Sequence, residues 1–120
     1  MNNEQIGLAR QYHQQRESRR QTQREAERQH WLQRTREAIL RLVPVHPEVR
    51  QVYLFGSLIQ PGRFRPDSDI DVAIACDTIE TESIFWRELE QELKRDVDLR
   101  PLAGVIAEEA TTRGEKVYER

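Results

Sequence analysis

The chain has 120 residues, of which 37% are hydrophobic and 33% are charged, and its formal net charge is −2. This size allows one small domain with a core of its own, and no apolar run approaches the ~20 residues that span a bilayer. The first residues lack the basic and apolar regions of a secretory signal. The only cysteine, Cys76, rules out an intrachain disulfide, and we expect it to be a small buried side chain in a cytoplasmic protein.

Charge is distributed unevenly along the chain. Residues 1–43 contain nine arginines and five glutamates, whereas residues 44–120 contain ten basic and sixteen acidic side chains. A shift of this kind separates two segments. We therefore expect an N-terminal helical extension over residues 1–43, suited to an anionic partner, and a globular domain over residues 44–120.

The N-terminal segment is expected to be one long helix. Residues 4–43 lack proline and are rich in Glu, Gln, Arg and Ala, which are tolerated or favoured in helices. Between Tyr12 and Trp31 a lone alanine is apolar, and a helix that is polar all round cannot be held by a core of its own. We expect residues 31–43 to pack on the domain and residues 4–30 to extend from it. The extension is either a solvated helix or an arm for homo-oligomerisation or partner docking.

The rest of the chain alternates strand patterns with helix patterns. Pro44 and Pro47 end the first helix, since each lacks an N–H group. The expected elements are strands over residues 49–55, 70–76 and 96–101, a helical turn over 57–60, and helices over 78–95 and 105–113. Val117 and Tyr118 form a last apolar pair. Strands that alternate with helices predict an α/β layer with a small sheet.

The stretch from Phe55 to Asp71 carries the chemistry. It predicts a strand end, a Gly56-Ser57 turn, an irregular connection and a strand that opens with acidic residues. Because side chains alternate along a strand, Asp69 and Asp71 lie on one face, roughly 7 Å apart. Glycine lets the backbone approach a phosphate closely, and a helix start offers free N–H groups and a hydroxyl. This pattern suits the binding of a phosphate and a cation side by side.

A third acidic residue, Asp98, lies in the third expected strand. Crowding it against Asp69 and Asp71 is unfavourable unless a cation compensates, and Mg2+ prefers oxygen ligands and accepts substrate phosphates as further ligands. A pair of such cations can activate an attacking oxygen and stabilise a leaving phosphate oxygen. Asp96 shares a face with Asp98 and is the alternative third ligand. We expect Asp67 to shape the loop.

Two segments resemble a known signature. Phe55-Gly56-Ser57 and Arg65-Pro66-Asp67-Ser68-Asp69-Ile70-Asp71 are similar to the motif of the DNA polymerase beta-like nucleotidyltransferase superfamily. The likeness is closest to the minimal nucleotidyltransferases, small proteins that are often antitoxins paired with HEPN-domain toxins, and it covers about residues 45–120. It implies a mixed sheet flanked by helices, and Mg2+-dependent transfer of a nucleotidyl group from a nucleoside triphosphate.

The resemblance also implies roles for individual residues. Gly56 and Ser57 would bind the triphosphate of ATP, Asp69 and Asp71 would ligate Mg2+, and Asp98 would complete this metal-binding and catalytic set and help to deprotonate the acceptor hydroxyl. In the antitoxin members the acceptor is a tyrosine of the partner toxin, which receives AMP. Since the chain is too short to hold a separate acceptor domain, we expect a HEPN-type partner to supply the acceptor.

Alternatives remain open at this point. The connection between Ser57 and Asp69 has eleven residues, one more than is common in the family, and we expect Arg63-Phe64-Arg65 to hold the extra residue. The two arginines are candidates for phosphate contacts. The altered loop and the basic arm favour a non-catalytic antitoxin that neutralises its partner by binding. Transfer to a small molecule such as an aminoglycoside, in a pocket across a dimer, is another alternative. Nucleic-acid binding by the arm ranks last, because the arm lacks interleaved aromatic side chains.

Overall fold

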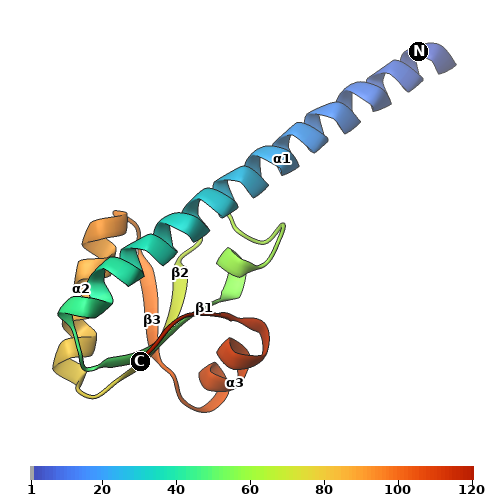
Figure 1. Ribbon diagram of the computed structural model, residues 1–120. Helices are drawn as coiled ribbons and strands as arrows, with labels where there is room; N and C mark the ends of the chain where they lie inside the picture. The colour runs from blue at the N-terminus through green and yellow to red at the C-terminus, as the bar shows by residue number, and fades with distance from the viewer. Residues whose placement is uncertain (1) are drawn as a thin grey trace.

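The structure is a computed structural model that describes residues 2–120. Its helices and strands, in chain order, are α1 (Asn3–Leu42), β1 (Val49–Phe55), β2 (Ile70–Cys76), α2 (Ile79–Leu93), β3 (Val97–Pro101), α3 (Gly104–Arg113) and β4 (Glu115–Glu119). Two 3-10 turns, Val43–Val45 and Gly56–Ile59, flank β1. The molecule measures 68 × 27 × 19 Å, because the N-terminal half of α1 projects far beyond the sheet (Figure 1).

The four strands form one mixed sheet in the order β3-β2-β1-β4. Strands β2 and β3 are parallel and are connected through α2, whereas β1 pairs antiparallel with β2 and with β4. The expected small mixed sheet flanked by helices, with a long N-terminal helix, is confirmed. Strand β4 was not expected. It is a short edge strand whose residues are only half-buried or exposed, so its alternation of apolar and polar residues is weak.

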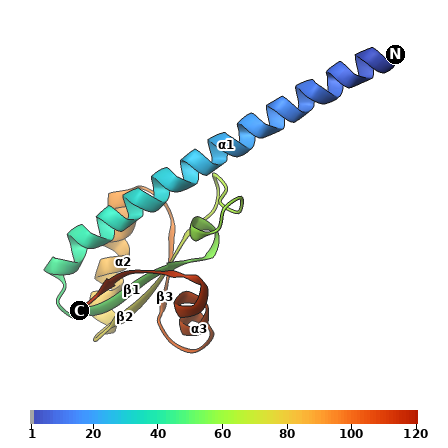
Figure 2. The ribbon, with the colours of Figure 1, turned by 45° about the vertical axis from the view of Figure 1, so that its right-hand side comes forward.

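The two faces of the sheet carry different layers. Ile70, Val72 and Ile74 of β2 point into the main core, which α1 and α2 cover. The opposite face carries a smaller cluster that includes Ala73 of β2 and Ala110 of α3. Figures 1 and 2 show α1 and α2 on one side of the sheet and α3 on the other. Residues that alternate with the core residues of β2 therefore face the α3 side.

Helix α1 begins with a capping box, in which Asn2 and Gln5 each bond the other's backbone N–H. Its buried side chains start at Arg28, so the docked part begins about one turn before the expected Trp31. Periodicity of apolar residues missed this turn because the residue that docks is charged. Arg28 Nη1 donates to the Leu58 carbonyl at 3.0 Å. Among residues 2–120, none of the helices combines the length and apolar character needed to cross a bilayer.

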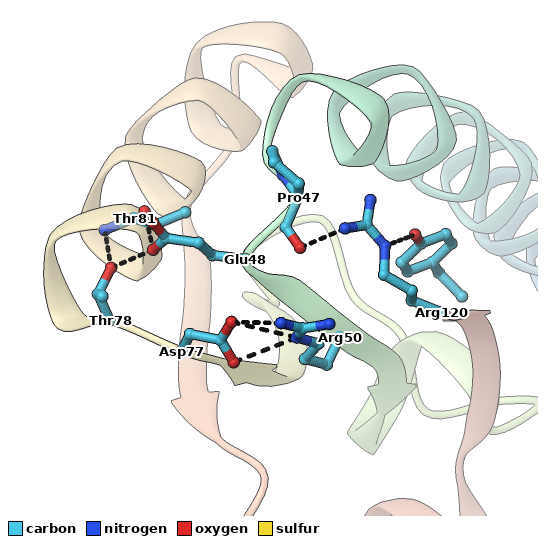
Figure 3. A network of polar contacts seen from close by, with 8 residues as sticks. Pro47, Glu48, Arg50, Asp77, Thr78, Thr81 and Arg120 are labelled. Atoms are coloured by element: carbon cyan, nitrogen blue, oxygen red, sulfur yellow. Dashed lines mark hydrogen bonds and ion pairs between the residues drawn. The ribbon is translucent and has the colours of Figure 1, made fainter.

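A polar network fixes the end of the sheet where β1 begins (Figure 3). Thr78 caps α2 by accepting a hydrogen bond from the Thr81 N–H at 3.2 Å. Both hydroxyls donate to one oxygen of Glu48, at 2.5 and 2.7 Å, and these bonds hold the pKa of Glu48 below its usual value. Beside them, Arg50 donates to both carboxylate oxygens of Asp77. The network secures the end of β1 that lies away from its Gly-Ser turn.

Candidate functional site

Asp71 and Asp98 are direct neighbours on the parallel strands β2 and β3. Each alternates with residues of the main core, so both side chains lie on the α3 face of the sheet. On the other side of β2, Asp71 is the register partner of Phe55, the last residue of β1. Asp69 precedes β2 by one residue and is exposed. The structure thus places two carboxylates side by side on the sheet and a third at the end of the loop that leads into it.

The charges at this point are poorly balanced. Burial, followed by the charges of Asp98 and Asp69, raises the pKa of Asp71 to about 6, and Glu109 of α3 adds to the increase. Arg100 opposes it. The Arg100 guanidinium lies on the same face as Asp98 and donates from Nε to Oδ1 at 3.3 Å. A half-buried carboxylate on which three other acidic charges and one arginine act marks a place where positive charge is lacking.

The donor set suits a divalent cation of the hard type in chemistry and in charge, because Mg2+ prefers carboxylate oxygens. The carboxylates are not preassembled, however. Over residues 2–120, no three His, Cys, Asp or Glu side chains are gathered closely enough to hold a metal ion. Asp69, Asp71 and Asp98 therefore form no closed cation site among the described residues, and a cation that keeps waters and takes phosphate oxygens as its other ligands needs fewer protein ligands than a closed site supplies.

Gly56 makes room for the Asp71 carboxylate. Its backbone has a φ of +73°, in the left-handed region that favours glycine. A Cβ atom added at Gly56 would lie 2.1 Å from Oδ2 of Asp71, far closer than two atoms can approach. The sequence predicts that this glycine lets a phosphate approach the backbone. The structure shows a second reason for a glycine here, because only glycine leaves space for the Asp71 carboxylate.

Ser57 is the second residue of the 3-10 turn Gly56–Ile59 and is half-buried. Its carbonyl accepts from the Gln60 N–H at 3.1 Å, and the Gln60 amide donates to the Gly56 carbonyl at 3.1 Å. The turn therefore forms where a helical turn was expected, one residue earlier. It joins the end of β1 to the loop beside the Asp71 carboxylate.

The other acidic candidates are placed differently. Asp96 is exposed and lies just before β3, and its backbone carbonyl accepts from the Ile70 N–H at 3.1 Å. Asp67 is exposed in the loop. Ser68 closes a loop turn, since its hydroxyl accepts from the Arg65 N–H at 2.9 Å and its own N–H donates to the Arg65 carbonyl. Asp96 and Ser68 thus contribute to the backbone around the site, a role for Asp67 in the loop stays a prediction, and among the neighbouring charges that of Asp98 acts most on Asp71.

Sequence reasoning missed three residues around the site. Arg100 could have been found, because it alternates with Asp98 in an expected strand and must share its face. The charge of Glu109 in α3 acts on Asp71, an effect that depends on how the helix packs and has no local signal. Arg95, in the turn between α2 and β3, donates to carbonyls of the loop before Asp69, and no sequence pattern marks it.

A separate groove lies between α1 and the β1–β2 loop. Its volume is about 420 Å³, and basic side chains stand on both walls. In Figures 1 and 2 the loop rises toward the middle of α1. The groove is lined by Arg20, Gln23, Arg24, Glu27, Phe64, Arg65 and Pro66. Its excess of arginine suits an anionic surface.

Comparison with known proteins gives a consistent result. The family model described as polymerase beta, nucleotidyltransferase, matches residues 37–120. The protein adenylyltransferase MntA of Shewanella oneidensis is 35% identical over 80 residues, which are 60% of this chain and 55% of MntA. The chain thus spans about half the length of that curated relative.

Solved structures share the fold. A toxin–antitoxin crystal structure with AMP-PNP is 28% identical, has a TM-score of 0.60, and covers 71% of this chain and 73% of its own. A complex of tri-AMPylated Shewanella oneidensis HEPN toxin with its MNT antitoxin is 25% identical, with a TM-score of 0.54, over 74% of this chain and 73% of its own.

Proposed function

Because the chain belongs to the polymerase beta nucleotidyltransferase family, we propose that it transfers AMP from ATP to a tyrosine hydroxyl of a HEPN toxin and so acts as an antitoxin. The observation that carries the proposal is the pairing of Asp71 with Asp98 on adjacent strands beside Gly56. The name of the MntA relative supports adenylyl transfer. The neighbours with AMP-PNP and with an AMPylated HEPN toxin support the donor and the acceptor.

In this proposal Asp69, Asp71 and Asp98 hold Mg2+. When bound, the cation supplies the positive charge that the carboxylates lack and that the phosphate oxygens of ATP require. The raised pKa of Asp71 supports this role, because a carboxylate that is costly to ionise alone gains most from a cation. Gly56 keeps the backbone clear of that carboxylate, and Ser57 offers its hydroxyl and N–H to the triphosphate.

Asp98 is the proposed proton acceptor. Its side chain is 34% exposed, so an acceptor hydroxyl from outside can reach it, whereas Asp71 is more enclosed between β1 and β3. Removing the hydroxyl proton lets the tyrosine oxygen attack the α-phosphorus of ATP, with pyrophosphate as the leaving group. Such a transfer depends on positioning and charge neutralisation more than on covalent chemistry by the protein.

We also propose that residues 44–120 act as the nucleotidyltransferase domain and that the extension over residues 1–43 serves docking. The groove between α1 and the β1–β2 loop supports this division, because Arg20 and Arg24 of the helix face Arg65 of the loop across it. An acidic surface of the toxin is the occupant that we propose. A second copy of this chain is the alternative, since residues 44–120 carry an excess of acidic side chains.

The test is transfer of label from α-labelled ATP to a purified HEPN toxin, in the presence of Mg2+. The double variant Asp69→Asn/Asp71→Asn should lose transfer by about 100-fold or more. Asp77→Asn is the matched control, because Asp77 is exposed just after the other end of β2 and pairs with Arg50. Transfer that persists in the double variant would overturn the proposal. Toxin neutralisation that persists without transfer would favour inhibition by binding alone.

A further inference from the structure

One side chain secures the loop that leads into the site. The Arg95 guanidinium donates from Nη2 to the backbone carbonyls of Arg65, Pro66 and Ser68, at 2.9, 3.0 and 2.7 Å. Its Nε donates to the Ser68 carbonyl as well, at 3.1 Å. Irregular backbone leaves its carbonyls without partners unless another group supplies donors. Here a single cation supplies them for three of the four residues that precede Asp69.

The guanidinium is itself held between two aromatic rings. Its Cζ atom lies 4.7 Å from the ring centroid of Trp31 in α1 and 4.5 Å from that of Phe64 in the loop. Phe64 is 4% exposed and belongs to the main core. Stacking against both rings while donating in the plane requires the flat, forked guanidinium group. Lysine has the charge but neither the plane nor the fork.

The hydrogen bonds from Arg95 act on the peptide group next to Asp69. The Ser68 carbonyl belongs to the same planar peptide group as the Asp69 N–H, so the bonds from Arg95 fix the orientation of that peptide. On the other side, the Ile70 N–H donates to the carbonyl of Asp96, the residue after Arg95, at 3.1 Å. Arg95 and Asp96 therefore bond to the backbone on both sides of Asp69, which is itself exposed and outside the strand.

We propose that Arg95 is a positioning residue for nucleotidyl transfer: it holds the loop so that Asp69 stays on the same face of the sheet as Asp71 and Asp98. This inference rests on the proposed function. The same bonds make the extra residue of the loop tolerable. They hold residues 65–68 to the turn before β3, so the position of Asp69 does not depend on where in the loop the extra residue lies. The open set of carboxylates can then bind a cation with little further ordering of the backbone.

A conservative pair of variants separates positioning from general stability. Arg95→Lys keeps the charge and loses the fork, whereas Arg34→Lys is the matched control. Arg34 stacks on the same Trp31 ring at 4.8 Å, and its hydrogen bond goes to the Glu92 carbonyl of α2 and not to the loop. The measurements are hydrogen exchange of the backbone amides of residues 65–70, binding of Mg2+ by calorimetry, and the Mg2+ dependence of AMP transfer.

Arg95→Lys should speed exchange over residues 65–70 and raise the half-saturating Mg2+ concentration by about 10-fold, as expected when a group that orients a metal ligand is lost. At saturating Mg2+ the kcat of this variant should be within roughly a few-fold of the parent's kcat, because the carboxylates that bind Mg2+ are all still present. Arg34→Lys should leave all three measurements close to those of the parent. Phe64→Leu, which removes one stacking ring and keeps the core filled, should change them in the same direction as Arg95→Lys and serves if that variant does not fold.

The outcomes distinguish the two proposals. A lower melting temperature in Arg95→Lys with unchanged Mg2+ binding would show a structural role only and would overturn the positioning role. Equal behaviour of the Arg95 and Arg34 variants would overturn it too. If the parent protein transfers no AMP, but the Arg95 variant still loosens residues 65–70 and weakens Mg2+ binding, the proposed function fails, while the narrower claim that Arg95 positions Asp69 for Mg2+ binding stands.

Discussion

Replacing Asp71 by asparagine should stabilise the protein at neutral pH in the absence of divalent cations. The folded structure raises the pKa of this carboxyl from 3.8 to about 6, so the ionised form is unfavourable in the folded state. One pKa unit corresponds to about 1.4 kcal/mol, and the shift to about 3 kcal/mol at pH 7. Solvent reaches this half-buried group, which reduces the expected gain in the free energy of unfolding to on the order of 1–2 kcal/mol.

The gain should depend on pH. Between about pH 4 and pH 6, the folded protein binds more protons at Asp71 than the unfolded chain does, so its contribution to stability falls as pH rises and levels off above pH 6. Glu48 and Asp77 act in the opposite direction, because hydrogen bonds hold their pKa values low. The parent protein's pH profile is therefore a mixture, and the difference between Asp71→Asn and the parent isolates the carboxylate of interest.

Urea unfolding at about pH 4 and about pH 7, with a chelator and then with millimolar Mg2+, tests this reasoning. The variant's advantage should be small at the lower pH and full at the higher one. Mg2+ should raise the free energy of unfolding of the parent and leave that of the variant unchanged. An advantage that is absent at neutral pH, or equal at both pH values, would refute the charge argument. Asp77→Asn, at the other end of β2, should give no gain at neutral pH.

Two other substitutions follow from the packing around the site. Gly56→Ala should lower the free energy of unfolding by more than about 1–2 kcal/mol, the cost of left-handed backbone, because the new methyl also meets Asp71. In an Asp71→Ala background the same change should cost less, which a double-mutant cycle by urea unfolding measures. Arg28→Met should cost about 1–3 kcal/mol, because it leaves the buried Leu58 carbonyl without its donor. Arg24→Met, exposed on the same helix, should stay within about 0.5 kcal/mol of the parent in that assay.

The strands and the face of the carboxylates were predictable from the sequence because they follow a period of two. Ile70, Val72 and Ile74 had to share a buried face, which placed Asp71 on the other one. The sequence suggested that Asp98 could converge with Asp71, and the family resemblance made it the third carboxylate. The parallel pairing that brings the two side by side was not predicted, since periodicity alone does not order the strands of a sheet. Strand β4 escaped notice because an edge strand with one solvated face carries few apolar residues.

The contacts that hold the site in place were out of reach for pattern reasoning. Arg28 docks on Leu58, and Arg95 docks on carbonyls some thirty residues earlier in the chain. A charged side chain that binds backbone carbonyls has the same local signature as a solvated one. Backbone acceptors look alike in every sequence, so only the folded arrangement shows which arginine they bind.

Arg95 explains how Asp69 can stay near Asp71 before a cation binds. Asp69 lies outside the strand ladder, so it can move away from the charge of Asp71 if its loop opens. Arg95 opposes that movement twice, through its bonds to the loop carbonyls and through its charge. Burial lowers the pKa of the Arg95 guanidinium, and the charges of Asp69 and Asp67 act against that decrease. Because one of the rings that hold Arg95 belongs to Trp31, the docked part of α1 helps to keep Arg95, and through it the loop before Asp69, in place. A deletion that removes α1 through Trp31 should therefore weaken Mg2+ binding, although no residue of that helix is among the proposed ligands.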